Sequence, residues 1–326
     1  MGELREKIKN SREIKDTSLN TYMSALKILK KAIAPKDKSP LNDAKFLHDY
    51  DNTMNIINNL KKTTSKKNKL TAILVALNSE DDKKQELIDK YHTVLKSLTD
   101  EYHSFIKTQT KTETQRKNWI SYDELIEVIN QLMIEVKLRK LNNKRVLNDK
   151  EFDLLQQLLI LRTYLFFPLR NDFADMKVLS ENEFNKLSED VQHSHNYLVV
   201  SKKGGKKFYI SQYKNSKYLG NKVLEIPSSL SRIINLWLKH NTSGFYLVKK
   251  DKEQPMSPNG ITKFLNKIFH KYHPGKKIST SLLRHIIISH LTKNEPTIAE
   301  KEKKEKETEN KFLHSAEMNE MYRKID

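Results

Sequence analysis

Apolar residues recur at three- and four-residue steps along most of this chain, which is the spacing of one face of an α-helix. The run from Thr17 to Ile33 shows this pattern clearly. The period changes in the second half, where three short runs have the residue types and lengths of strands. These runs are Tyr197–Val200, Lys207–Ile210 and Lys222–Ile226. The sequence therefore predicts a mainly α (α+β) protein in which helices accompany a small antiparallel β-sheet.

A chain of 326 residues is long enough for two domains, each with a core of its own. Residues 107–118 are almost wholly polar and form the predicted linker. Ser121 and Glu124 then give the S-x-x-E pattern of a capping box, which predicts the start of a new helix. We expect a helical N-terminal domain with its linker over residues 1–117. A second domain is expected over residues 118–326, with the apolar helix Phe152–Phe167 in its core.

The charge of the chain predicts a polyanionic partner. Its 60 basic and 41 acidic residues give a formal net charge of +19, which suits DNA, RNA or an acidic membrane surface. Lys61, Lys62, Lys66 and Lys67 are candidate DNA contacts, although the same lysines would also suit a nuclear-import patch or simple solvation.

Neither a membrane span nor a signal segment is expected. No apolar run approaches the roughly 18 residues that a spanning helix needs, and the N-terminal residues include no apolar signal core. We therefore expect a soluble, intracellular protein without a membrane partner, in the cytoplasm or the nucleus, wherever its target resides.

Several classes of cofactor site are absent from the sequence. The chain has no cysteine, which excludes disulfides, thiol chemistry and cysteine-ligated zinc. Its histidines form no HExxH pattern, and its few glycines form no GxxxxGK[ST] phosphate loop. His193 and His195 are expected in a loop before a strand. We expect no metal ion and no cofactor.

The first residue with candidate chemistry is Arg170. It follows Pro168, which is predicted to end the apolar helix, in the segment Phe167-Pro168-Leu169-Arg170-Asn171-Asp172-Phe173-Ala174-Asp175-Met176. A guanidinium group offers a bidentate fork to a phosphate. We also expect a helix to begin at this arginine, so that its N-terminus adds to the positive field.

Lys214 is the second candidate, in the predicted turn Tyr213-Lys214-Asn215-Ser216-Lys217 between two strands. An ammonium group crowded by other cations can have its pKa lowered enough to give up a proton. Lys217 and Lys206 are rival proton donors.

Arg284 lies in the predicted helical segment Thr280-Ser281-Leu282-Leu283-Arg284-His285-Ile286-Ile287-Ile288-Ser289-His290. Ser281, three residues earlier, can donate a hydrogen bond to a phosphate but is uncharged and a poor base. His285 is an awkward substitute, because neighbouring residues of a helix point about 100° apart. Near the C-terminus, His314 and Tyr322 add a hydrogen-bond donor and a phenol in the segment Phe312-Leu313-His314-Ser315-Ala316-Glu317-Met318-Asn319-Glu320-Met321-Tyr322.

Taken in order, Arg170, Lys214, Arg284, His314 and Tyr322 resemble the active-site residues of the tyrosine recombinase, or phage integrase, family. The resemblance covers residues 119–326. It implies that the two arginines bind a DNA phosphate and that Lys214 protonates the departing 5′ oxygen. It further implies that His314 helps to position the phosphate, and that Tyr322 attacks it to form a 3′-phosphotyrosine link.

The chain departs from the pattern of the family at three positions. Ser281 stands where the family usually has His or Lys. Phe173 stands where an acidic residue commonly follows the first arginine, so Asp172 and Asp175 both compete for that role. Leu313 replaces a usual glycine before His314.

The expected function is therefore that of a site-specific DNA recombinase or integrase. The resemblance implies a double-stranded DNA partner, a homotetramer in the DNA synapse, and a monomer or weak dimer when free. The N-terminal domain would be the DNA-clamping, core-binding domain. The composition is similar to that of recombinases from large eukaryotic DNA viruses and virophages. Two alternatives stay open: a type IB DNA topoisomerase, and a DNA-binding protein with a degenerate active site.

Overall fold

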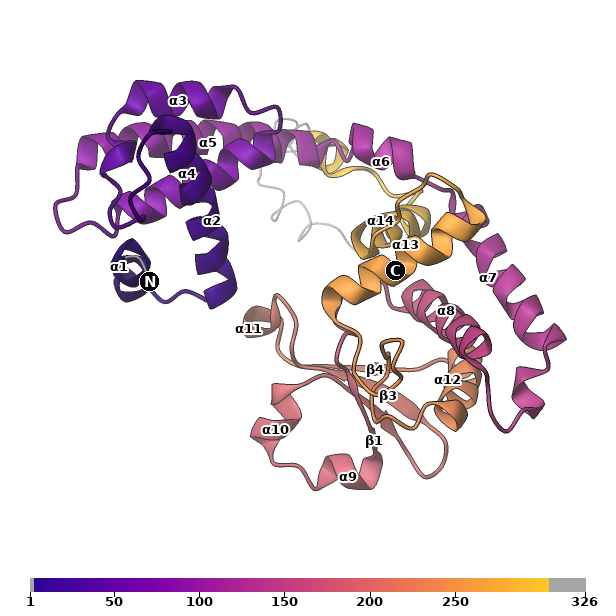
Figure 1. Ribbon diagram of the computed structural model, residues 1–326. Helices are drawn as coiled ribbons and strands as arrows, with labels where there is room; N and C mark the ends of the chain where they lie inside the picture. The colour runs from indigo at the N-terminus through magenta and orange to yellow at the C-terminus, as the bar shows by residue number, and fades with distance from the viewer. Residues whose placement is uncertain (1–2, 305–326) are drawn as a thin grey trace, which may run out of the picture. The chain divides into compact units, whose positions relative to one another are not determined.

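The computed structural model describes residues 3–304 (Figure 1). They are mainly helical and include a small β-sheet, which confirms the predicted fold class. They divide into two compact units, residues 3–110 with 296–304, and residues 111–295. The division falls inside the polar stretch predicted as a linker. It differs from the expected domains in that residues 296–304 group with the N-terminal unit.

The N-terminal unit is a helical bundle with one core. Its elements are α1 (Glu3–Ser11), α2 (Asp16–Ile33), η1 (Lys45–Leu47), α3 (Tyr50–Asn58), α4 (Thr63–Leu77) and α5 (Gln85–Lys107). α4 packs against both α2 and α5. The buried Tyr91 ties α5 to η1, because its hydroxyl donates to the Leu47 carbonyl over 2.9 Å.

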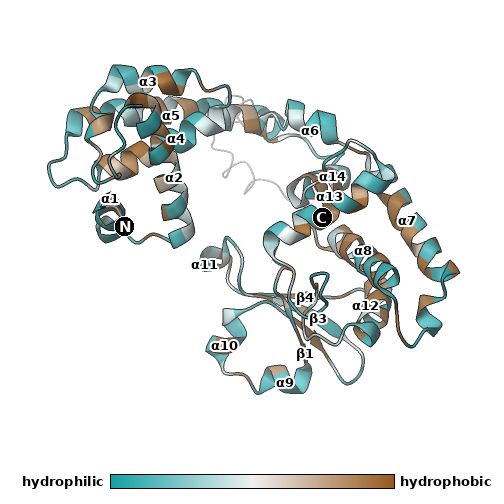
Figure 2. Ribbon diagram, viewed as in Figure 1, coloured by the Kyte–Doolittle hydropathy of each residue, from teal (hydrophilic) through white to brown (hydrophobic). Residues whose placement is uncertain are grey.

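The second unit is built around α8 (Asp149–Phe166). Its other helical elements are α6 (Glu113–Asn118), α7 (Tyr122–Leu138), η2 (Leu141–Asn143), α9 (Glu181–Asn185), α10 (Glu189–Ser194), α11 (Ser216–Leu219), α12 (Ser228–His240), α13 (Pro258–Tyr272) and α14 (Thr280–Leu291). α8 is buried on most of its circumference and packs against α7 and α12, whose apolar residues Figure 2 shows in brown. No helix in the described part of the chain has the length and apolarity to cross a membrane.

Side-chain caps fix where three helices of this unit begin, and one of these caps was predicted. The capping box of α7 is confirmed, because Ser121 Oγ accepts from Glu124 N–H and the Glu124 carboxylate accepts from Ser121 N–H. Asn148 and Glu151 form the same arrangement at the start of α8. The predicted linker is partly helical, because Thr112 and Gln115 form another capping box that starts α6.

The sheet is mixed, and not wholly antiparallel as predicted. Its strands follow the order β1 (Lys177–Ser180), β2 (Tyr197–Val200), β3 (Lys206–Ile210) and β4 (Lys222–Glu225). The three predicted strands pair antiparallel, but β1 joins the edge parallel to β2. The sequence analysis missed β1, because a run of four residues between a turn and a helix carries too little periodicity.

Buried polar groups on α8 fix the segment that follows α12. The Tyr246 hydroxyl lies 2.6 Å from Thr163 Oγ1, and Thr163 donates its own proton to the Leu159 carbonyl. The Tyr246 hydroxyl must therefore be the donor to Thr163, since each hydroxyl has a single proton. Trp237 Nε1 donates to the Tyr246 carbonyl over 2.8 Å, so α8 and α12 hold the same residue.

We expect Thr163→Val to lower the free energy of unfolding by about 1–3 kcal/mol, because it leaves the buried Tyr246 hydroxyl without a partner. Chemical denaturation measures the loss. The double variant with Tyr246→Phe removes both polar groups and should recover part of it. A double variant less stable than the sum of the two single variants would contradict this assignment.

Candidate functional site

The Arg170 loop is bracketed by two aromatic rings. Phe167 follows the last residue of α8, and Phe173 lies three residues beyond Arg170. Both rings pack against Phe208 of β3, with ring centroids 5.5 and 5.4 Å away. The apolar ends of the loop are thus fixed in the core, while Arg170 between them is exposed.

The backbone at Arg170 is held in a turn and not at the start of a helix. Tyr164, on the last turn of α8, donates from its hydroxyl to the Arg170 carbonyl over 2.7 Å. Residues 170–175 form bends and turns that lead directly to β1. The expected helix N-terminus is therefore absent here, and the positive field comes from side chains.

Arg284 reaches this loop from α14. Its Nε donates to the Pro168 carbonyl over 2.7 Å. Burial lowers the pKa of Arg284 from its usual value, and the charge of Arg170 lowers it further. The structure thus brings together the two arginines that the sequence analysis singled out, within electrostatic range of one another.

Asp172 is the acidic residue that accompanies the pair. Its Oδ2 accepts from the Arg170 backbone N–H over 3.1 Å, and both arginines act on it electrostatically. Burial nevertheless raises the pKa of its carboxyl group above the usual value. Phe173 lies in the core and Asp175 is exposed in a left-handed backbone conformation (φ 51°). Asp172 and Asp175 were the two candidates for the acidic residue that follows the first arginine. Asp172 fits that position better, because it contacts the Arg170 backbone.

The two guanidinium groups keep unused donors. Among the described residues, nothing accepts a hydrogen bond from the side chain of Arg170 or from the terminal nitrogens of Arg284. Each guanidinium group is a fork of fixed geometry that suits a phosphate or a carboxylate. Two such forks on supported backbone form a site for an oxyanion, whose charge would relieve their mutual repulsion.

A cavity of about 420 Å³ opens beside Arg170, and Asn196 forms part of its wall. The Asn196 side chain is 6% exposed and makes four hydrogen bonds. Its Nδ2 donates to the carbonyls of Asp172 and Gln212, and its Oδ1 accepts from the N–H groups of Ser211 and Gln212. Asn196 therefore ties the Arg170 loop to the end of β3. No local motif marks this residue, so the sequence analysis missed it.

His195 lines the same cavity, in the loop where the sequence analysis expected it. Its Nδ1 lies 2.8 Å from Ser194 Oγ, which donates its own proton to the Val191 carbonyl. The ring must then donate from Nδ1. This cavity thus combines the Arg170 guanidinium group, the carboxyl groups of Asp172 and Asp175, and an imidazole.

Lys214 lies close to this cavity along the chain. It is exposed in the turn that follows β3, two residues after Gln212, which lines the cavity. Two residues of extended chain span about 7 Å. Its rival Lys217 is exposed on α11.

Lys206, the other rival proton donor, is buried at the start of β3. It donates to the Gly204 carbonyl and to Ser231 Oγ on α12, and burial lowers its pKa. Its amine is thus engaged inside the unit, whereas the amines of Lys214 and Lys217 make no hydrogen bond to a described residue.

Ser281 is exposed in the first turn of α14, one turn before Arg284. Residues three apart lie on one helix face, so its hydroxyl is on the side of Arg284. It lines a small cavity of about 150 Å³ together with His285 and Lys277. Partial burial lowers the pKa of His285, and the charge of Arg284 lowers it further, which favours the uncharged form of its ring. His285 is therefore poorly suited to supply the positive charge that Ser281 lacks.

The remaining candidates belong to the N-terminal unit or lie outside the described residues. Lys61 and Lys62 precede α4 as exposed residues, and Lys66 and Lys67 lie half-buried on α4, all within the N-terminal unit. Lys67 places its amine 4.6 Å from the ring centre of Tyr102. His314 and Tyr322 lie outside the residues that the structure describes.

We expect Asp172→Asn to raise the melting temperature at pH 7. The folded-state pKa of this carboxyl is raised, so the fold favours its neutral form and loses stability as the pH rises through that pKa. The advantage of the variant should shrink as the pH falls from 7 towards 4. Asp251→Asn is the opposite case, because backbone hydrogen bonds lower the pKa of Asp251. A less stable Asp172→Asn variant at pH 7 would contradict the expected sign.

Asn196→Ala should lower the free energy of unfolding by about 2–4 kcal/mol, because it strands several buried hydrogen-bonding groups. It should also weaken the binding of inorganic phosphate, measured by titration calorimetry, because the Arg170 loop loses its anchor. Asn241→Ala is the matched control. The Asn241 amide is also buried, but its hydrogen bonds go to Ser243 and Phe245 in the turn after α12 and not to the Arg170 loop. If both variants bind phosphate equally well, Asn196 does not position Arg170.

Comparison with known proteins adds no assignment. No protein-family model matches the chain, and no curated protein matches it. The function has therefore to be inferred from the residues and their arrangement.

Proposed function

We propose that this protein is a site-specific DNA recombinase that cleaves and rejoins DNA through a 3′-phosphotyrosine intermediate. One observation carries the proposal. Arg170 and Arg284 are 114 positions apart in the sequence, yet the Arg284 side chain is bonded to the loop that holds Arg170. Their guanidinium donors that have no acceptor among the described residues support the binding of a DNA phosphate.

In this proposal the arginines bind the non-bridging oxygens of the scissile phosphate. A phosphodiester resists attack because its negative charge repels nucleophiles. Preorganised donors neutralise that charge and stabilise the additional charge of the pentacoordinate transition state, each by roughly 3–4 kcal/mol. The Pro168 carbonyl and Tyr164 hydroxyl hold the two arginine-bearing elements before DNA binds. Little reorganisation is then needed during the reaction.

Tyr322 is the proposed nucleophile. Its phenolic proton passes to water, and the phenolic oxygen bonds to phosphorus while the bond from phosphorus to the 5′ oxygen breaks. Lys214 gives a proton to the leaving 5′ oxygen, and His314 and Ser281 donate hydrogen bonds to the phosphate. The phosphotyrosine bond retains the energy of the broken bond, so a 5′ hydroxyl can reverse the step without ATP or metal.

The proposed partner is double-stranded DNA. The protein would bind it as a homotetramer, in a synapse that joins two duplexes. Lys61, Lys62, Lys66 and Lys67 would contact backbone phosphates, and such contacts weaken as salt displaces them. The net charge of +19 supports a polyanionic partner of this kind.

A DNA suicide substrate tests the proposal directly. A duplex nicked just beyond the cleavage site loses its short 5′ fragment after attack, so the covalent protein–DNA adduct accumulates. We expect the full-length protein to form this adduct, seen as a shifted band on a denaturing gel, and Tyr322→Phe to form none. Tyr218→Phe is the matched control, because Tyr218 is 89% exposed on α11 and has no proposed role.

Other results would replace the proposal. Equal adduct yields from Tyr322→Phe and the natural protein would mean that another residue is the nucleophile. Absence of any adduct, with DNA binding retained, would leave a DNA-binding protein with a degenerate site. Relaxation of a supercoiled plasmid without recombination between two sites would identify a type IB topoisomerase.

A further inference from the structure

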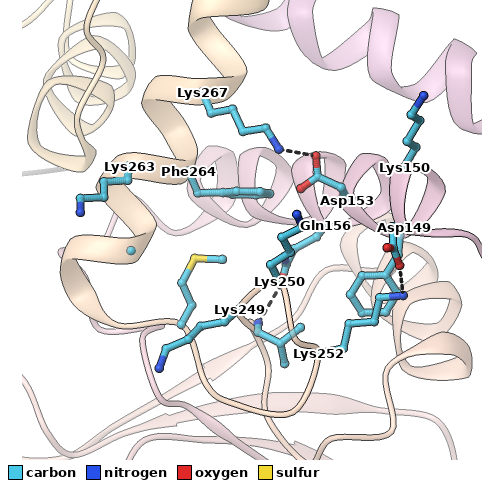
Figure 3. A pocket seen from close by; sticks show the side chains of 14 residues that line it. Asp149, Lys150, Asp153, Gln156, Lys249, Lys250, Lys252, Lys263, Phe264 and Lys267 are labelled. Atoms are coloured by element: carbon cyan, nitrogen blue, oxygen red, sulfur yellow. Dashed lines mark hydrogen bonds and ion pairs between the residues drawn. The ribbon is translucent and has the colours of Figure 1, made fainter.

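A second cavity, of about 680 Å³, lies near the N-terminal end of α8 (Figure 3). It is formed by the first turns of α8, by the segment from Val248 to Met256, and by α13. This cavity and the one beside Arg170 share no lining residue, although Pro258 of the Arg170 cavity lies between Met256 and Gly260 of this one. The two cavities are thus neighbours with different linings.

The centre of this cavity is apolar. Phe264 contributes a half-buried ring, Phe152 and Met256 contribute small apolar areas, and the fully buried Val248 lies behind them. Its volume lies within the roughly 300–1,000 Å³ that is typical of sites for small organic molecules. These walls are supported by the core, since Phe152, Val248 and Met256 are buried. The cavity can hold an apolar group of about that size.

Lysines surround the apolar centre. Two of them are paired, Lys252 with Asp149 at 2.7 Å and Lys267 with Asp153 at 2.9 Å. Four other lining lysines form no ion pair with a described residue: Lys150, Lys249, Lys250 and Lys263. Figure 3 shows the Lys267 amine directed at Asp153, and the Lys249 and Lys263 amines directed away from the Phe264 ring. The cavity therefore carries excess positive charge at its rim.

Gln156 adds a free donor inside the cavity. The residue is 4% exposed, and its Oε1 accepts from the Val248 backbone N–H over 2.8 Å. That bond fixes the orientation of the amide, because only the oxygen can accept. Its Nε2 has no acceptor among the described residues and is not sealed from solvent. An oxygen atom of a ligand would satisfy this donor.

We propose that the cavity binds a small organic anion, in which a carboxylate or phosphate group is attached to an apolar body. The apolar body would fill the space between Phe152 and Phe264, and the anionic oxygens would accept from Gln156 Nε2 and pair with rim lysines. Duplex DNA does not fit this combination, because its charged backbone gains nothing from an apolar floor. The proposal does not depend on the recombinase assignment.

The test uses the full-length protein and the fluorescent aromatic anion 1-anilinonaphthalene-8-sulfonate. We expect saturable binding that is displaced by dodecanoate or by dodecyl phosphate. Whichever of the two competes at the lower concentration identifies the preferred anionic group. The neutral analogue dodecanol should compete about tenfold less well or worse, since it lacks the charge that the lysines attract.

Two variants locate the site. Gln156→Glu keeps the acceptor for Val248 but replaces the free donor with a negative oxygen, and should weaken dye binding about tenfold or more. Lys249→Glu with Lys250→Glu should weaken it similarly. These two lysines are exposed, so this variant still tests the site if Gln156→Glu unfolds. Lys202→Glu with Lys203→Glu is the matched control, because both residues are exposed in the turn between β2 and β3.

Three outcomes would overturn the inference. Unchanged dye affinity in the lysine variant would place the dye elsewhere. Equal competition by dodecanol and dodecanoate would remove the role of charge. Displacement of the dye by duplex DNA but not by dodecanoate would make these lysines part of a nucleic-acid surface. None of these results bears on adduct formation by Tyr322, so the two proposals fail independently.

Discussion

The hydrogen bond from Arg284 Nε to the Pro168 carbonyl is the interaction on which the candidate active site depends. It joins α14 to the loop after α8 across 116 positions of sequence. It uses only one edge of the guanidinium group, and the terminal nitrogens have no acceptor among residues 3–304. Burial lowers the pKa of Arg284, and the charge of Arg170 lowers it further, so the Arg284 cation is less favourable here than in water. An oxyanion between the arginines would offset this effect, so the site is electrostatically suited to a phosphate.

This arrangement requires a rigid support, which the second unit provides through different kinds of contact. Aromatic packing of Phe167 and Phe173 on Phe208 fixes the ends of the Arg170 loop. Asn196 then fixes the middle of the loop through Asp172. Because the supporting groups are buried and the arginine is exposed, the charged side chain can meet a ligand while its backbone stays in place.

The two cavities of this unit differ in their chemistry. The cavity beside Arg170 is lined mainly by polar residues of the loop after α8 and of the segments that flank β2 and β3. Near the N-terminal end of α8, the cavity around Gln156 has an apolar centre and a lysine rim. Gln156 and Thr163 also bond to Val248 and the side chain of Tyr246, so α8 positions one wall of the second cavity directly.

The sequence by itself determined the features that depend on neighbouring residues. Long helices such as α2 and α8, the S-x-x-E cap at Ser121, the end of α8 before Pro168 and the strands β2, β3 and β4 all follow from local periodicity and capping. The short helices α6, α9, α10 and α11 were not predicted. The sequence also singled out Arg170 and Arg284 as a pair. Only the tertiary structure decided that β1 adds parallel to β2, that a turn replaces the expected helix at Arg170, and that Asp172 accompanies the arginines. Asn196 likewise became visible only in the fold. Each of these depends on contacts between segments distant in sequence, and no local pattern of residue types encodes such contacts.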